Sequence, residues 1–473
     1  MMPRPRSIEI PRPRAALLAA VTGLGAILGI LACPGGASPA PDEANGPESR
    51  RVGMYSCGGR GCHGAVGAVK PAEGDVYIKD GASTTWLYFD PHARAYDVLL
   101  DPRSVKIADK LKIPQAHKSE LCLSCHATSS PPKGVSPGVE LERNGIDCEA
   151  CHGGAEKWLN SHLLPEWRAR PATEKALDGL NDLSTPAARA ALCVECHVGN
   201  RSRGMDMNHD LIAAGHPRLN FEFASYQAAY PKHWKEAHEK APAAAAKAGE
   251  FEAKSWSVGQ AATAKAVLQL LADRAEVSED ASLKKGPAPE AIWPEFSEYE
   301  CFACHHGLSN PSPFQAPGHS AVGPGRLPWE TWPMEMIPRV AEGQAGVDLG
   351  FLKELRDEMG RLAPDPKKVA GLSRQGVLQL DKLLKGLEEK PVDAARVDAL
   401  IKALSSDPSV TGEGWDRKAQ HYLALSALGR AAGGLGVAVG PKVEESLKAK
   451  ADGLRFPPKY DSPHGVAPPA PRP

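Results

Sequence analysis

Large aromatic side chains are scarce in this sequence. Phenylalanine, tryptophan and tyrosine together make up 6% of the 473 residues, and hydrophobic residues as a whole reach 42%. Glycine and proline are abundant instead, with 46 and 43 residues. A chain of this length usually forms two to four domains, and this sequence has few large apolar side chains to fill their cores. We therefore expect that side chains alone do not fill the interior.

Net charge is also nearly absent, because 56 basic and 57 acidic residues leave a formal charge of −1. A balanced chain has no global field that would attract nucleic acid, so we expect no nucleic-acid partner, and any protein docking to be local. Persistent alternation of polar and apolar residues is missing as well. This favours a mainly α fold of short helices and loops.

Cysteine hardly occurs outside one repeated pattern. Ten of the eleven cysteines form five pairs, and a histidine directly follows each pair. In chain order, the first to fifth motifs are Cys57-Gly-Gly-Arg-Gly-Cys62-His63, Cys122-Leu-Ser-Cys125-His126, Cys148-Glu-Ala-Cys151-His152, Cys193-Val-Glu-Cys196-His197 and Cys301-Phe-Ala-Cys304-His305. The last four are C-x-x-C-H sequences, the pattern of covalent haem c attachment.

The spacing of these motifs suits that chemistry. Residues three and four apart share one face of a helical turn, so both sulfurs can reach one haem edge while the histidine becomes the proximal ligand of the iron. The first motif has four intervening residues, and three of them are glycine. Glycine tolerates the backbone angles of a bulge that returns both sulfurs to one edge. The sequence thus predicts five haem c groups, whose apolar mass would complete the interior.

Three other uses of the cysteines compete with this prediction. Zinc could bind the four cysteines of the second and third motifs, but the repeated trailing histidine would then be unexplained. Disulfides would suit an exported protein, although cysteines three apart on a helix bridge poorly. A thioredoxin-like redox motif needs one pair between a strand and a helix, whereas this chain has five pairs.

Several further histidines are candidates for the distal ligand on the other side of an iron: His92, His117, His162, His209, His216 and His319. His209 and His216 are almost two helical turns apart, which suits two different irons and is too far for one. Pro217 is expected to end that helix. Four others lie in charged or terminal surroundings, where a solvated or capping role is expected: His233, His238, His421 and His464.

Residues 1–33 have the layout of an export signal, with four arginines before an uncharged run from Ala15 to Ala32. Cys33 follows that run as in a bacterial lipoprotein signal, which makes it a candidate for lipidation. Ordinary cleavage near residues 37–40 is the alternative, and an uncleaved membrane anchor is a third reading because the run is nearly long enough to span a bilayer. Each of these predicts a periplasmic or otherwise exported protein, with possible membrane attachment through its N-terminus.

The rest of the chain divides by composition. We expect a linker at 34–52, a multihaem cytochrome c domain at 53–325 with a helical arm at 226–279, a cysteine-free helical region at 326–457, and a disordered tail at 458–473. Thr185 and Pro186 are expected to cap and open the helix that leads to Cys193. Helices are predicted at 352–361, 377–388 and 394–404.

Three segments carry a resemblance to a known family: Trp86 to Tyr96, Cys148 to Gly154, and Ala213 to Arg218 with Phe221-Glu222. Over roughly residues 55–310 the chain resembles the tetrahaem cytochrome c family of ammonia-oxidising bacteria and its multihaem relatives. The resemblance implies a helical, closely stacked haem array, mostly bis-histidine irons of which one can be five-coordinate, and His92 and His216 as distal ligands. The fifth motif, the irregular first motif and the long C-terminal region depart from that family.

The expected function is electron transfer between redox protein partners through about five haems. The alternative is a haem enzyme that acts on a small nitrogen or sulfur compound at one open iron. None of the five motifs ends in the lysine that marks the ammonia-forming nitrite reductases. This favours an electron carrier, and no catalytic residue is predicted.

Overall fold

The structure is a computed structural model of the chain, and it describes residues 49–65, 81–128, 141–240, 243–284, 288–301, 304–305, 326–329, 332–407 and 415–441, with a few single positions beyond. All of them belong to one compact unit, residues 46–473. The export signal, Cys33, His319, His464 and the tail lie outside the described residues. None of the helices in the described ranges combines the length and hydropathy needed to cross a bilayer.

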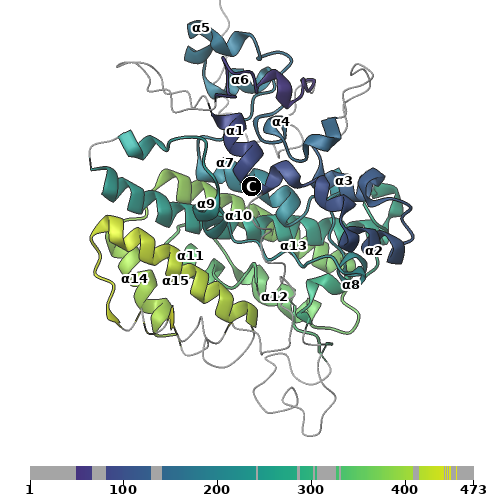
Figure 1. Cartoon of the computed structure of the whole chain (residues 1–473). Helices are drawn as coiled ribbons and strands as arrows, with labels where there is room; N and C mark the ends of the chain where they lie inside the picture. The colour runs from purple at the N-terminus through teal and green to yellow at the C-terminus, as the bar shows by residue number, and fades with distance from the viewer. Residues whose placement is uncertain are drawn as a thin grey trace, which may run out of the picture. The chain divides into compact units, whose positions relative to one another are not determined.

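The N-terminal part of this unit is built from short helices (Figure 1). They are α1 (Ala82–Phe89), α2 (Pro102–Lys110), α3 (Glu120–His126), α4 (Cys148–His152), α5 (Pro165–Ala169), α6 (Ala172–Leu177), α7 (Pro186–His197), α8 (His209–Ala214) and α9 (Phe223–Ala229). Single turns of 3-10 helix join them: η1 (Met54–Ser56), η2 (Pro91–Arg94), η3 (Asp97–Leu100), η4 (Ala116–Lys118), η5 (Leu141–Asn144), η6 (Ser161–Leu163), η7 (Arg201–Arg203) and η8 (Ala237–Lys240).

The short helices begin and end at residues that suit those positions. Asp147 accepts a hydrogen bond from the N–H of Glu149 at the start of α4, and Gly153 ends that helix with a φ of 81°. Thr185 accepts from the N–H of Ala188 at the start of α7, which confirms the predicted cap. α8 ends at Gly215, in the left-handed region, rather than at Pro217 as predicted. A left-handed glycine stops the helix before proline can.

One long helix, α10 (Ala244–Glu279), packs against both parts of the unit. It contacts α7 in the motif-bearing part and α13 and α15 in the C-terminal part. Small and apolar side chains such as Ala253, Trp256, Ala264 and Leu268 are fully buried along it. A helix buried on most of its circumference has no strong polar face, so α10 is a central element of the core and not an isolated arm.

The C-terminal helices cover α10. They are α11 (Ile337–Ala341), α12 (Gly350–Met359), α13 (Pro366–Glu389), α14 (Ala394–Ser405) and α15 (Trp415–Leu435), preceded by the turns η9 (Ala281–Leu283) and η10 (Phe296–Glu298). α12, α13 and α14 confirm the three predicted helices. At Gly376 a Cβ atom would lie 2.5 Å from the ring of Phe351 and 2.6 Å from Leu268. Only glycine therefore lets α13 approach α10 so closely.

Described residues form no extended strand, only isolated bridges such as that between Asn200 and Met205. The mainly helical fold class is confirmed. Side-chain packing is uneven, because one large apolar cluster surrounds α10 and takes in parts of α7 and α9, whereas the helices before α7 contribute to two small clusters. The space between these small clusters is a cavity, described next.

Candidate functional site

Three of the five motifs lie on helices that end at the motif histidine. α3 carries Cys122 to His126, α4 carries Cys148 to His152, and the last turn of α7 carries Cys193 to His197. In the fifth motif the N–H of His305 donates to the carbonyl of Cys301 at 2.8 Å, which closes the same kind of turn. Each of these motifs therefore presents two sulfurs and one imidazole from a single turn.

The first motif closes the corresponding contact across two additional residues. The N–H of His63 donates to the carbonyl of Cys57 at 3.2 Å, and the N–H of Cys62 donates to the carbonyl of Gly59. A Cβ atom on Gly64 would lie 2.0 Å from the carbonyl oxygen of Gly58, so the loop closes only with glycine there. The glycine-rich insertion thus forms the bulge that the sequence predicts.

Each motif histidine faces one other histidine ring. The distances between ring centroids are 6.3 Å for His63 and His162, 6.2 Å for His126 and His216, 6.1 Å for His152 and His233, 6.0 Å for His197 and His92, and 6.3 Å for His305 and His209. Two metal–nitrogen bonds of about 2 Å, together with the inner radius of each ring, leave roughly 6 Å between the centroids of two imidazoles on one metal. All five pairs have the separation of such axial ligands.

Four of the six candidate distal histidines lie in these pairs, namely His92, His162, His209 and His216. His209 and His216 belong to different pairs, in keeping with their spacing. His117 lies in none of the five, and its ring packs against Tyr96 at 6.4 Å. The ring opposite His152 is that of His233, which sequence reasoning assigned to a solvated or capping role.

The segment around His233 is held in place by a buried ion pair. Glu236 accepts hydrogen bonds from both terminal nitrogens of Arg189 on α7, at 2.7 and 2.8 Å, and from Trp234 Nε1 at 2.8 Å. Burial raises the pKa of Glu236, but the hydrogen bonds from Arg189 and Trp234 outweigh it and hold the pKa below its usual value. The flanking aromatic residues Tyr230 and Trp234 were the available sequence signal that this charged segment packs against the rest of the chain.

The surroundings of several paired imidazoles favour their neutral form, which is the form that binds metals. Burial, with smaller contributions from neighbouring histidines, lowers the pKa of His152 and of His197 to about 4. Burial also lowers the pKa of His126 and His216. The Nδ1 atoms of His126, His162 and His216 lie 2.8, 2.5 and 2.8 Å from backbone carbonyl oxygens, which leaves Nε2 as the nitrogen available to a metal.

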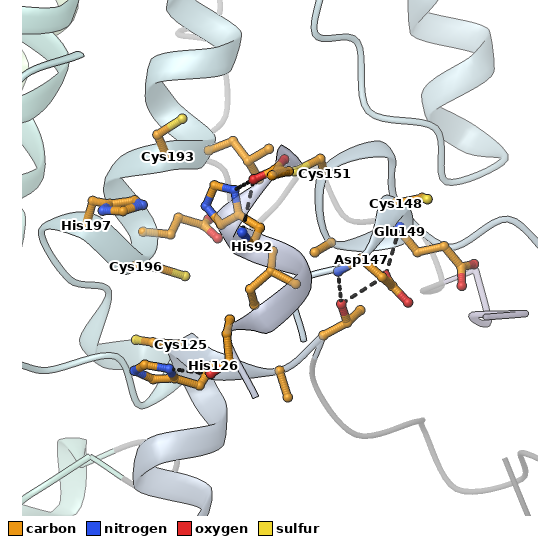
Figure 2. Close-up of a pocket in the computed structure, with 18 of the residues that line it drawn as sticks. His92, Cys125, His126, Asp147, Cys148, Glu149, Cys151, Cys193, Cys196 and His197 are labelled. Carbon is orange, nitrogen blue, oxygen red and sulfur yellow. Dashed lines mark hydrogen bonds and ion pairs between the residues drawn. The ribbon is translucent and has the colours of Figure 1, made fainter. Parts of the chain in front are cut away.

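His92 has a different partner. Its Nδ1 lies 2.9 Å from a carboxylate oxygen of Asp90, and the hydroxyl of Tyr230 donates to the other oxygen at 2.6 Å. Burial raises the pKa of Asp90, but the contacts with His92 and Tyr230 outweigh it, so the pKa lies below its usual value. Figure 2 shows His92 facing His197 across the cavity.

Four of the five pairs line one continuous cavity of about 1600 Å³. A pocket for a single small molecule usually measures roughly 300–1,000 Å³, so this cavity has room for several haem-sized groups. His209 and His305 of the fifth pair are not among the described residues that line it. The residues present therefore fit haem c in ligand type, ligand separation and space.

Cysteines of different motifs meet inside the cavity. A hydrogen bond between Cys57 and Cys148 lowers the pKa of Cys57 and raises the pKa of Cys148. A hydrogen bond between Cys125 and Cys196 likewise lowers the pKa of Cys125 and raises the pKa of Cys196. Figure 2 shows Cys125 and Cys196 on neighbouring helices.

The third and fourth motifs lie within electrostatic range of one another. Burial, followed by the nearby Cys193, raises the pKa of Cys151 to about 12. Cysteines that bind haem c become thioethers and no longer titrate. The positions of these sulfurs are therefore what matters, because they indicate which motifs are neighbours.

The fifth pair is held by buried charges. Glu295 accepts from the N–H of His209 at 2.8 Å, and Arg274 of α10 pairs with Asp206 and Glu298, both at 2.5 Å. Arg274 therefore binds both the segment before α8, through Asp206, and the segment before the fifth motif, through Glu298.

The arrangement of the described cysteines bears on their competing uses. All ten motif cysteines are free of disulfides. Cys125 and Cys148 each lie beside a cysteine of another motif, so the second and third motifs do not gather into a four-cysteine site. Across the described ranges no group of three or more histidine, cysteine, aspartate or glutamate residues is arranged to hold a bare metal ion.

The expectation of a solvated His421 was wrong. This residue of α15 is 1% exposed, and its Nε2 lies 3.5 Å from a carboxylate oxygen of Glu335. It belongs to the packing of the C-terminal helices.

Residues 82–153 match the family described as Cytochrome c554 and c-prime. The matched stretch contains the second and third motifs and His92. It supports a c-type cytochrome that carries haem c. Comparisons with curated proteins and with solved structures gave no match.

Proposed function

We propose that this protein is an exported multihaem c-type cytochrome that transfers electrons between redox protein partners through five covalently bound haems. The observation that carries the proposal is that every motif histidine faces one further histidine at 6.0 to 6.3 Å. In this assignment each motif supplies two sulfurs and a proximal ligand. The distal ligands are His162, His216, His233, His92 and His209 for the first to fifth motifs.

Haem at these positions supplies an iron that takes up and gives up one electron, and bis-histidine ligation leaves no axial position for a substrate. Five filled pairs therefore favour an electron carrier over the alternative, an enzyme with one open iron. His117, the candidate left without an iron, packs against Tyr96.

The neighbouring sulfurs support a linear order of the sites. Cys57 lies beside Cys148 and Cys125 beside Cys196, which supports adjacent first and third motifs and adjacent second and fourth motifs. Cys193 lies within electrostatic range of Cys151, which supports a fourth motif that follows the third. α8 extends this order, because His209 at its start belongs to the fifth pair and His216 just past its end belongs to the second. The proposed relay therefore runs through the first, third, fourth, second and fifth motifs.

Export is proposed from the sequence of residues 1–33, which has the layout of an export signal. Lipidation of Cys33 would attach the protein to a membrane surface. Mass spectrometry of the mature N-terminus distinguishes a lipidated Cys33 from cleavage near residues 37–40.

The proposal is tested by counting haems and examining their irons. We expect five haems per chain by alkaline pyridine assay, only low-spin ferric signals in electron paramagnetic resonance, and no change of the reduced optical spectrum with carbon monoxide. A haem count of four would remove one motif from the proposal. A high-spin iron that binds carbon monoxide in the unmodified protein would favour the enzyme.

A further inference from the structure

Among the four paired histidines whose Nδ1 partner the structure gives, His92 differs from the other three. Where the structure gives the partner of Nδ1, it is a backbone carbonyl for His126, His162 and His216. For His92 it is a carboxylate oxygen of Asp90, at 2.9 Å. A neutral acceptor and a charged acceptor have different effects on the same imidazole.

The Asp90 carboxylate is fixed and shielded from water. Asp90 is 3% exposed, and the oxygen that contacts the His92 ring also accepts from the backbone N–H of His92 at 3.0 Å. Its other oxygen accepts from the Tyr230 hydroxyl at 2.6 Å. Within the described ranges no arginine or lysine forms an ion pair with Asp90, so its charge acts on His92 without a cation to offset it.

A charged acceptor raises the basicity of a ligating imidazole. When Nδ1–H donates to a carboxylate, electron density moves toward Nε2, and Nε2 becomes a stronger donor to the metal. A stronger donor and a nearby negative charge both stabilise the ferric state more than the ferrous state. The hydrogen bond from Tyr230 withdraws part of the negative charge and so moderates the effect.

We propose that Asp90 is a positioning and tuning residue that lowers the reduction potential of the iron held between His92 and His197. This inference rests on the proposed function, because it needs haem at the fourth motif. That motif lies in the middle of the proposed relay, between the third and the second. Asp90 thereby sets the potential of a site that lies inside the proposed relay and not at either end.

The first test is Asp90→Asn in the full holoprotein, followed by optical redox titration and electron paramagnetic resonance. Asparagine keeps an acceptor of the same shape and removes the charge. We expect the equilibrium constant for reduction of one haem to rise about tenfold, which equals about 59 mV for one electron. The low-spin signal of the same haem should shift, because the donor strength of its ligand changes.

The matched control is Asp147→Asn. Asp147 is also buried beside a haem motif, but it accepts from Thr128 and from the N–H of Glu149 and contacts no imidazole. We expect this variant to leave the potential and the signal of the Asp90-dependent haem unchanged. An equal shift in both variants would overturn the inference, because any buried charge would then have the same effect.

Tyr230→Phe tests the same contact in the opposite direction. It removes the donor to Asp90, so the potential of the same haem should fall. If the protein keeps five low-spin haems and neither Asp90→Asn nor Tyr230→Phe moves a potential, the inference fails and the proposed function stands. If the peptide that contains Cys193 and Cys196 carries no haem by mass spectrometry, the proposed function and the inference both fail.

Discussion

At the scale of single residues, the sequence favours His117 over His233 as a distal ligand, whereas the structure favours His233. His117 lies five residues before the second motif, yet its ring contacts Tyr96. His233 lies in a charged segment, yet its ring lies 6.1 Å from that of His152. The buried pair of Arg189 and Glu236 accounts for this placement, because it draws the charged segment against α7.

Replacing His233 should open one iron. We expect His233→Ala to convert one of five low-spin haems to a high-spin form that binds carbon monoxide, because alanine supplies no ligand. Optical titration with carbon monoxide and electron paramagnetic resonance measure this directly. His117→Ala is the matched control and should leave all five haems low-spin. If His117→Ala gives the high-spin haem and His233→Ala leaves all five haems low-spin, His117 is the ligand and His233 is not.

At the scale of elements, α10 links the cysteine-free helices to the haem-binding part. Its central feature is Arg274, which is buried among Asp206, Glu298 and the carbonyl of Met207. Burial lowers the pKa of this guanidinium, but the two carboxylates outweigh burial and raise the pKa, so the group stays charged. Because Asp206 precedes α8 and Glu298 precedes Cys301, one side chain of α10 fixes both sides of the fifth site.

Arg274→Met should damage the fifth site before the others. Removing one partner of a buried ion pair leaves unpaired charge and typically costs about 3–5 kcal/mol. We expect one haem to become high-spin as His209 moves away, with a lower midpoint of thermal unfolding.

Arg374→Met provides the comparison for this variant. It breaks a pair with Asp273 and Glu276 in which the arginine side chain is 36% exposed, so it should cost about 1 kcal/mol or less and leave five low-spin haems. Equal effects of the two substitutions would argue against a specific role for Arg274.

At the scale of the whole molecule, the five ring pairs fall into two orientations. The planes are nearly parallel in His63–His162 and His209–His305, at 20° and 24°. They are steeply inclined in the other three pairs, at 64°, 81° and 83°. An imidazole can bind a metal at any rotation of its ring about the metal–nitrogen bond. The angle between two ring planes is therefore set by the chain around each ring.

This arrangement predicts two classes of low-spin signal. The angle between two imidazole planes sets the splitting of the iron d orbitals, so near-parallel and near-perpendicular pairs differ in anisotropy. We expect electron paramagnetic resonance of the oxidised protein to contain the two classes in a ratio of two to three. Removing the fifth haem with Cys301→Ala and Cys304→Ala should take away one signal of the near-parallel class. Loss from the other class would contradict the assignment of His209 and His305.

Much of the fold could be predicted from the sequence because its signals are local. The cap at Thr185 and the helices near residues 352–361, 377–388 and 394–404 depend on neighbouring residues and on helical periodicity. The predicted end of α8 at Pro217 lies past the observed end, because the left-handed Gly215 stops the helix first. The central place of α10 was not predicted, since periodicity shows that a helix forms but not what covers it.

The sequence by itself determined the chemistry of the cofactor: five cysteine pairs with trailing histidines, and too few large side chains to fill the interior without it. Only the tertiary structure decided which histidine faces which. A distal ligand reaches its partner through space, across chain segments whose length and composition place few limits on where they fold. The contact of Arg189 with Glu236, which holds the segment of His233, and the contact of Asp90 with Tyr230 join segments far apart in the chain, and no spacing in the sequence encodes them.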